Sequence, residues 1–218
     1  DGKMYISDWI NGWGGTGKGR IYTLKHDQHS KDPRVAETRK LFGEGFKQRS
    51  VDELVKLLEH DDMRVRLRAQ FALADKRATD ALEKVALNSG HQLARLHAMW
   101  GIGQTGDVGR LIGLLVDHDA EIRAQAARLA GDHHLKEAAP KLTQMLGDDN
   151  ARVRFFAAMA LGKVKHKPAI EPLIATLRSN VDKDRFLRHA CVMGLTWMED
   201  IDAVLAHAND ASPAVRMG

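Results

Sequence analysis

VRFFAAMALG, from Val153 to Gly162, is the stretch that decides the fold. It places an apolar residue before an arginine, and a small residue three positions after that arginine. The same skeleton recurs in MRVRLRAQFALA from Met63, HQLARLHAMWGI from His91, DAEIRAQAARLA from Asp119 and RFLRHACVMGL from Arg185. Self-similarity at a near-constant spacing is typical of repeat architectures, so we expect one small unit to be stacked several times.

The arginine of this skeleton gives the period. The structural repeat arginines are Arg66, Arg95, Arg123, Arg154 and Arg188, and Arg216 begins a further unit. Their spacings are 29, 28, 31, 34 and 28 residues. We predict that these arginines bridge successive units through acidic loop residues such as Asp62, Asp119 and Asp149. A basic stripe that contacts phosphates is the alternative.

Two helical stripes alternate within each period. The first, in the arginine-bearing segment, places apolar residues at i, i+4, i+7 and i+8, on one face of a helix. The second follows at i, i+3, i+4 and i+7, over residues 51–58, 78–85, 108–115, 139–146, 170–177 and 201–208. Six hairpins are predicted, each with an arginine-bearing first helix and a second helix. Since one hairpin cannot bury its stripe, stability should come from contacts between neighbours.

These residues resemble HEAT-type repeats, of the short variety also found in phycobilisome-lyase-like proteins. The resemblance rests on the V-R-x-x-A-x-x-A-L-G core and spans residues 32–218. It implies a mainly α fold, a right-handed α-solenoid of about six hairpins whose second helices line the concave face. We expect residues 31–218 to form this solenoid, truncated at its C-terminal end.

Small residues recur at two places in the arginine-bearing helices. Four glycines fall where these helices should end, which predicts left-handed helix caps: Gly101, Gly103, Gly131 and Gly162. A column of alanines allows close helix approach, namely Ala69, Ala98, Ala126 and Ala157. Cys191 falls in the same column, which favours a buried small side chain over a nucleophile.

The first thirty residues lie outside the repeat. KMYISDW and RIYTLKH have the aromatic and β-branched content of strands, and they flank the glycine-rich GWGGTGKG. The segment from Gly12 onward is one residue short of a phosphate loop, because Gly19 stands where a hydroxyl is required. A strand also follows in place of the helix that completes such an anion site. We therefore predict a β-hairpin over residues 1–30, with no nucleotide site.

This N-terminal segment is similar to the closing strands of the β-propeller in bacterial membrane-bound dehydrogenases of the glucose/sorbosone-dehydrogenase type. Asp1-Gly2, Asp8-Trp9 and Gly19-Arg20 carry the resemblance. In that family a HEAT array and then a c-type cytochrome domain follow the propeller. The resemblance implies that residues 1–30 are a propeller remnant, and that the parent protein is extracytoplasmic or membrane-associated. It also assigns the oxidoreductase chemistry to the propeller and the electron acceptor to the haem domain.

Composition favours no charged partner. The 33 Lys and Arg exceed the 29 Asp and Glu by only 4, so nucleic acid is an unfavoured partner. One cysteine excludes a CxxC metal knuckle and a C-x-x-C-H haem attachment. No stretch approaches the ~20 apolar residues of a membrane span. His133-His134, beside Asp132, could attract a metal, although solvated loop histidines are the favoured interpretation.

No residues in this segment resemble a cofactor site, so we predict no catalytic residue, no cofactor and no enzyme activity here. Trp100 and Trp197 are interpreted as packing residues. The preferred function is a non-catalytic interaction or spacer scaffold within a larger dehydrogenase-like protein. Its partners would be the neighbouring propeller and cytochrome-like domains or a separate protein.

The predicted protein-binding residues belong to the second helices, which mix both charge signs. They are Lys56, Lys84, Arg110 and Lys141, expected on the concave face. The alternative function is a HEAT-like DNA-binding protein similar to the alkylation-repair glycosylases, which cradle a duplex in a basic concavity beside a catalytic aspartate. Nothing in this sequence marks such an aspartate.

Overall fold

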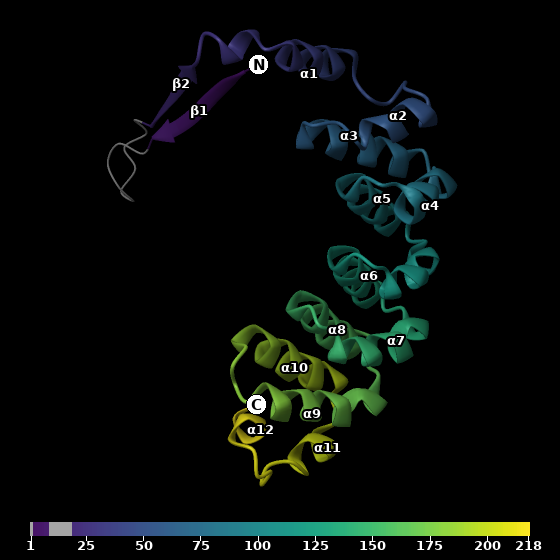
Figure 1. The fold of residues 1–218 in the computed structure, drawn as a ribbon, viewed down its shortest axis with the longest axis vertical. Coiled ribbons are helices and arrows are strands. Elements are labelled where there is room, and N and C mark those ends of the chain that lie inside the picture. Colours follow the sequence, from purple (N-terminus) through teal and green to yellow (C-terminus); the bar gives the residue numbers. More distant parts are fainter. Residues whose placement is uncertain (1, 9–18) are drawn as a thin grey trace.

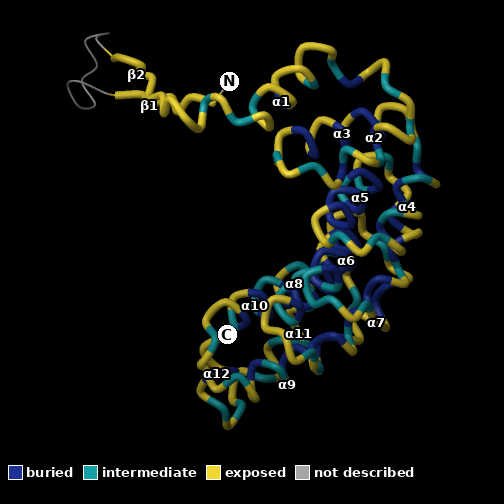
Figure 2. Tube along the Cα trace, turned by 45° about the horizontal axis from the view of Figure 1, so that its top comes forward, coloured by how far each residue is buried: buried dark blue, intermediate teal, exposed yellow. Residues whose placement is uncertain are grey.

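The computed structural model describes residues 2–8 and 19–218, so the predicted glycine-rich loop at residues 12–18 lies outside the described residues. The predicted hairpin is confirmed: β1 (Lys3–Asp8) and β2 (Arg20–Lys25) pair antiparallel, with Lys3 opposite Lys25 and Asp8 opposite Arg20. All residues of both strands are exposed. The hairpin stands away from the helices in Figures 1 and 2.

Helices in two layers follow along an open arc, which confirms the predicted mainly α, HEAT-type solenoid (Figure 1). The inner layer contains α3 (Met63–Asp75), α5 (Gln92–Thr105), α6 (Ala120–Asp132), α8 (Ala151–Lys163) and α10 (Arg185–Met198). The outer layer contains α2 (Val51–Leu57), α4 (Thr79–Asn88), the 3-10 helix η3 (Val108–Val116), α7 (Ala139–Gln144), α9 (Ile170–Asn180) and α11 (Ile201–Leu205).

Shorter elements complete the chain at both ends of the arc and between the layers. A 3-10 turn η2 (His29–Lys31) and helix α1 (Pro33–Glu44) precede the stacked pairs, and α12 (Pro213–Met217) closes the described chain. Three further 3-10 turns flank the outer helices: η4 (Lys136–Ala138), η5 (Met145–Gly147) and η6 (Lys167–Ala169). The η3 segment is 3-10 where α-helical periodicity was expected, and its Gly109 and Gly113 lower α-helix propensity.

The arginine-bearing helices form the inner layer, so the prediction that the second helices line the concave face is wrong (Figure 1). Of the outer helices, each inner helix contacts chiefly the one before it, as α3 does α2 and α5 does α4. The unit is therefore an outer helix followed by an inner one, starting at each predicted second stripe. Small side chains between neighbouring inner helices allow them to approach closely, which makes their layer the shorter side of the arc.

The core lies between the two layers and runs along the whole arc (Figure 2, dark blue). Both predicted stripes contribute to it, as Val65 and Leu73 do from α3 and Leu82 does from α4. Each inner helix begins at a residue whose side chain accepts a backbone N–H of the first turn: Asp62, His91, Asp119, Asn150 and Asp184. Polar caps thus fix the register of each helix, and the apolar stripe then faces the core.

The four glycines that were expected to cap these helices lie inside them instead, and none has a positive φ. A Cβ at Gly162 would lie 2.5 Å from Gly194 Cα, and one at Gly131 would lie 2.7 Å from Ala160 Cα. These glycines therefore permit close contact between inner helices. The left-handed residue comes eleven positions after each repeat arginine and is glycine only once: Arg77, Gly106, His134, Lys165 and Glu199.

Candidate protein-interaction surface

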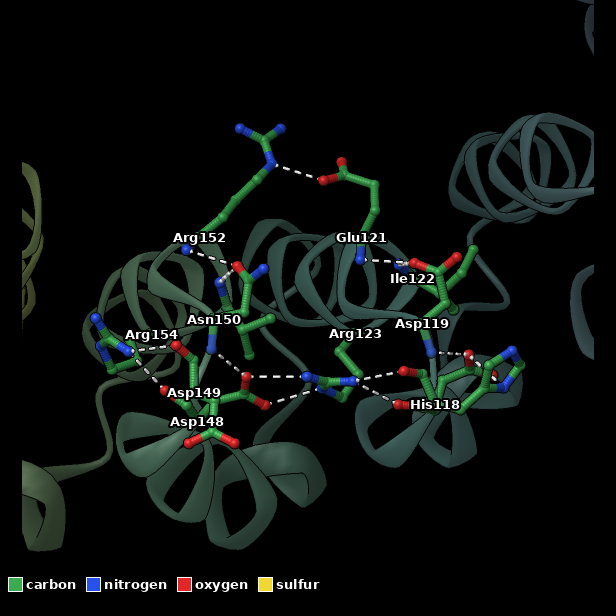
Figure 3. Close-up of polar contacts among 12 residues, drawn as sticks. His118, Asp119, Glu121, Ile122, Arg123, Asp148, Asp149, Asn150, Arg152 and Arg154 are labelled. Carbon is green, nitrogen blue, oxygen red and sulfur yellow. Dashed lines mark hydrogen bonds and ion pairs between the residues drawn. The ribbon is translucent and has the colours of Figure 1, made fainter.

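The repeat arginines tie each inner helix to the loop that precedes it. Arg123 donates Nη1 to the carbonyl oxygens of Asp117 and His118, at 2.8 and 3.1 Å (Figure 3). Arg154 makes the same two bonds six and five residues back, at 2.7 and 3.0 Å. Arg66 repeats the pattern at 2.7 and 2.8 Å. The arginine column is therefore structural at these positions.

Two of the arginines also bridge to the next unit. Arg95 donates to the Asp117 carboxylate, at 3.2 Å from Nη1. Arg123 donates to Asp148 through Nε and Nη2, at 2.8 and 2.9 Å (Figure 3). The hydrogen bond from Arg123 is the main reason that the pKa of Asp148 lies below its ordinary value. The term clamp is used below for these two bridges, Arg95 to Asp117 and Arg123 to Asp148.

The clamps use different carboxylates from those predicted. Asp62 and Asp119 cap α3 and α6, and Asp149 offers only its backbone carbonyl. The carboxylate that reaches the preceding unit lies two residues before the cap, at the start of the loop. Arg188 is a further exception, because the longer loop before it lets Arg188 pair with Asp182 of its own unit.

Arg66 lacks the carboxylate that completes the two clamps. Its side chain is buried and, among the residues that the structure describes, its Nε has no hydrogen-bond partner. The position equivalent to Asp117 and Asp148, six residues before the next repeat arginine, is Ser89. Ser89 accepts the N–H of His91, as the two aspartates accept the N–H two residues on. Its hydroxyl is uncharged and donates to Glu59 Oε1 at 3.1 Å, so it offers Arg66 no anion.

Replacing Ser89 with aspartate is expected to stabilise the protein by about 1 to 2 kcal/mol, because charged hydrogen bonds contribute about that much. The free energy of unfolding by urea is the measurement. Ser89→Asn is the matched control, since it adds a similar side chain without the charge. A gain for Asn equal to that for Asp would contradict the assignment, as would a gain that survives Arg66→Met.

His97 gives the inner layer a dependence on pH. It is buried in α5, with Nδ1 2.8 Å from Gln70 Oε1. Burial, together with the charge of Arg66, lowers its pKa from 6.5 to about 4. The imidazole is therefore neutral in the folded protein at neutral pH.

The folded protein is expected to lose up to about 3 kcal/mol of stability as pH falls from 6.5 to 4. The unfolded chain binds a proton at His97 in this range and the folded chain does not, so stability present above pH 6.5 is lost on acidification. Unfolding free energies measured at several pH values test this, and His97→Gln should flatten the slope. An unchanged slope in that variant would refute the role of His97.

The exposed side of the inner layer is rich in aromatic and aliphatic side chains. The buried sides of these helices face the outer layer, so their exposed side forms the concave face. Five residues after the repeat arginines stand Phe71, Trp100, Arg128, Met159 and Met193. Other partly or fully exposed apolar residues on these helices are Leu67, Leu93, Phe155, Phe156, Phe186 and Trp197. Exposed apolar side chains gathered on well-packed helices are typical of interaction sites.

Polar contacts hold part of this concave face in place. Trp100 Nε1 donates to Gln125 Oε1 at 3.1 Å, and Gln125 donates to Glu121 at 2.8 Å. Arg152 pairs with Glu121 at 2.9 Å (Figure 3) and lies over the ring of Phe156, 5.0 Å from its centroid. Trp100 is thus half-buried packing, as predicted, and also part of an exposed surface. In the sequence, this surface is indicated by the mostly apolar residues five positions after the repeat arginines, which lie beside the buried stripe.

The four predicted binding residues lie in the outer layer. Lys56, Lys84, Arg110 and Lys141 are exposed on α2, α4, η3 and α7. Their placement on the concave face is wrong, because their helices form the convex side. Arg110 is also engaged by Asp80, at 2.8 Å, and by Glu83. That these residues bind protein stays a prediction.

Other predicted features have clear positions. Cys191 is buried, and burial raises its pKa to about 12. His133 and His134 are exposed, and His134 Nδ1 lies 2.8 Å from the carbonyl oxygen of Lys163. Within residues 2–8 and 19–218, no three His, Cys, Asp or Glu side chains gather as metal ligands. Over the same part of the chain, no helix has the length and apolarity to span a membrane.

Comparison with known proteins supports the repeat assignment. Residues 108–196 match the HEAT repeats family. The complex of CpcE and CpcF of phycocyanin lyase from Nostoc sp. PCC7120 superposes with a TM-score of 0.55 and 21% identity, over 78% of this chain and 74% of that one. The fold is a HEAT-repeat solenoid. At this identity the similarity shows the fold alone.

Two weaker structural similarities accompany it. Human deoxyhypusine hydroxylase matches with a TM-score of 0.48 and 19% identity, over 68% of this chain and 62% of that chain. An engineered protein matches with a TM-score of 0.48 and 17% identity, over 78% and 93% of the two chains. Comparison with curated protein sequences finds no match.

Proposed function

We propose that this HEAT-repeat chain is a non-catalytic protein-interaction scaffold that binds its partner on the concave face of the inner layer. The observation that carries the proposal is the run of exposed and half-buried apolar side chains along α3, α5, α8 and α10. Phe71 is 38% exposed and Phe186 is 63% exposed, although both lie on well-packed helices. Covering such side chains with a partner removes apolar area from water.

The charges of the concave face favour protein over duplex DNA. Arg64 pairs with Asp62, Arg152 with Glu121, and both Arg128 and Lys163 with Asp132. A DNA-binding face keeps its cations available for phosphates, and each of these pairs would have to be broken or shared. The DNA-binding alternative therefore fits the inner layer less well.

A finer proposal places the scaffold as a spacer in a larger, dehydrogenase-like, extracytoplasmic protein. The β-hairpin supports it, because its strands expose large apolar residues such as Ile21, 74% exposed, and Tyr5, 56% exposed. A two-stranded hairpin is only marginally stable alone, so it suits the edge of a larger sheet. The order of hairpin and helical array also agrees with that family. Reading the gene on both sides tests this: the proposal needs a propeller upstream and a C-x-x-C-H downstream.

Site-specific photo-crosslinking tests the scaffold function. A benzophenone amino acid would replace Phe71 or Met193 on the inner layer, and Lys84 on the outer layer as the matched control. In cells that produce the native protein, the inner positions should crosslink to one protein partner and position 84 should not. Crosslinking only from position 84 would transfer the binding surface to the predicted outer residues. The absence of a protein adduct from both inner positions would refute the concave face.

A further inference from the structure

A groove crosses the C-terminal parts of α6, α8 and α10. Two adjoining hollows of about 60 and 390 Å³ form it, and they share Asp132 and Lys163 in their linings. Its floor is apolar, from Phe156 and Met159 of α8 to Trp197 of α10. The glycine contact between α8 and α10 keeps this floor low, because no side chain projects at Gly162.

Cations outnumber carboxylates in the lining of this groove. Arg128, Lys163 and Lys165 face only two carboxylates, those of Asp132 and Glu199. Lys165 pairs with Glu199 at 2.8 Å, so Asp132 must serve both of the others. One positive charge therefore lacks a counter-charge of its own within the lining.

In this groove a cation lies beside an aromatic ring, an arrangement that suits a ligand with both a charged and an apolar group. Lys163 Nζ lies 5.7 Å from the centroid of the Trp197 ring. Asp132 pairs with both Arg128 and Lys163. A carboxylate from a ligand could take over the pairing with Lys163. An adjacent apolar side chain could then lie on Phe156, Met159 or Trp197. Hydrogen bonds to a charged partner and a buried aromatic contact are the usual hot spots of an interface.

We infer that this groove binds a segment of a partner protein in which an acidic side chain stands next to an aromatic or large aliphatic one. The inference rests on the proposed scaffold function and adds the chemistry of the partner. Charge complementarity selects the acidic residue, and the apolar floor selects its neighbour. A basic segment would bring a like charge against Arg128, Lys163 and Lys165.

Panning of a random peptide library displayed on phage, using the full chain as bait, tests the inference. Counter-selection uses the variant Lys163→Glu, whose folding is checked by circular dichroism. Enriched peptides should combine Asp or Glu with an adjacent Phe, Trp, Leu or Met. The affinity of a synthetic copy of the best peptide should fall about tenfold or more in Lys163→Glu and in Trp197→Ser. The variant Lys40→Glu, at an exposed position on α1, should bind it as the wild type does.

Several results would overturn the inference. They are enrichment of peptides without acidic residues, equal binding by the wild type and Lys163→Glu, and enrichment of no peptide. Tight, salt-sensitive binding of oligothymidylate displaced by the peptide would assign the groove to single-stranded nucleic acid instead. If the groove fails while inner-layer crosslinking still captures a protein partner, the scaffold function stands and only the partner chemistry is wrong.

Discussion

Replacing Arg95 with alanine is expected to lower the free energy of unfolding by about 3 to 5 kcal/mol, the usual cost of removing one member of a buried ion pair. The Arg95 and Asp117 side chains are only 6% and 10% exposed. Arg95 Nε also donates to the Ala86 carbonyl oxygen at 2.8 Å. The substitution therefore removes the arginine from both the Asp117 carboxylate and the Ala86 carbonyl at the contact between two units.

Denaturant unfolding measures this loss, and hydrogen exchange of α5 amides locates it, since a solenoid can open one unit at a time. Arg95→Lys should recover only part of the stability, because an ammonium cannot hold the carboxylate and the carbonyl in one planar fork. The double variant Arg95→Met/Asp117→Leu should cost less than Arg95→Ala. A loss below about 1 kcal/mol in Arg95→Ala would mean that the pair acts as an exposed one.

Gly162→Ala is expected to destabilise the protein by about 3 kcal/mol, at the upper end of the usual cost of overpacking. The added Cβ would lie 2.5 Å from Gly194 Cα and 2.7 Å from Gly194 O. These are backbone atoms, which cannot rotate away as a side chain does. Helices α8 and α10 would have to separate, and the groove floor between Met159 and Trp197 would change with them.

Gly113→Ala is the matched control for this substitution. Gly113 is exposed in η3, and a Cβ there meets no atom within 4 Å. Its replacement should be neutral or stabilising by up to about 1 kcal/mol, through the lower entropy of the unfolded chain. Thermal unfolding distinguishes the two variants, and equal effects would contradict the close contact between the two helices.

The sequence predicts the helices well because each stripe reports local geometry. Val65 and Leu82 are buried where their stripes place them. It does not predict which layer is concave, since curvature depends on how closely neighbouring helices approach. Gly162 shows the same limit: a small residue near a helix end suits both a left-handed cap and a helix contact, and only the neighbour at Gly194 decides.

The candidate site was less predictable than the fold. The binding residues were sought among the charges of the second helices, on the assumption that those helices line the concave face. The concave face proved to combine apolar residues with paired charges, and its column beside the buried stripe contains Phe71 and Met159. The inner helices contain more apolar side chains than the buried stripe needs, and counting these extra residues would have indicated an apolar concave face. The clamp partners Asp117 and Asp148 could not be predicted, because loop geometry decides which aspartate reaches the arginine and helical periodicity gives no information on the loops.

The two clamps have a mechanical consequence, because they join only the middle units. Arg95 ties α5 to the loop before α6, and Arg123 ties α6 to the loop before α8. Arg66 lacks its carboxylate, and Arg188 is held within its own unit. Arg178 links the last two units through Asp210, at 2.6 Å, so under a pull on its two ends the arc should extend first at its N-terminal turns.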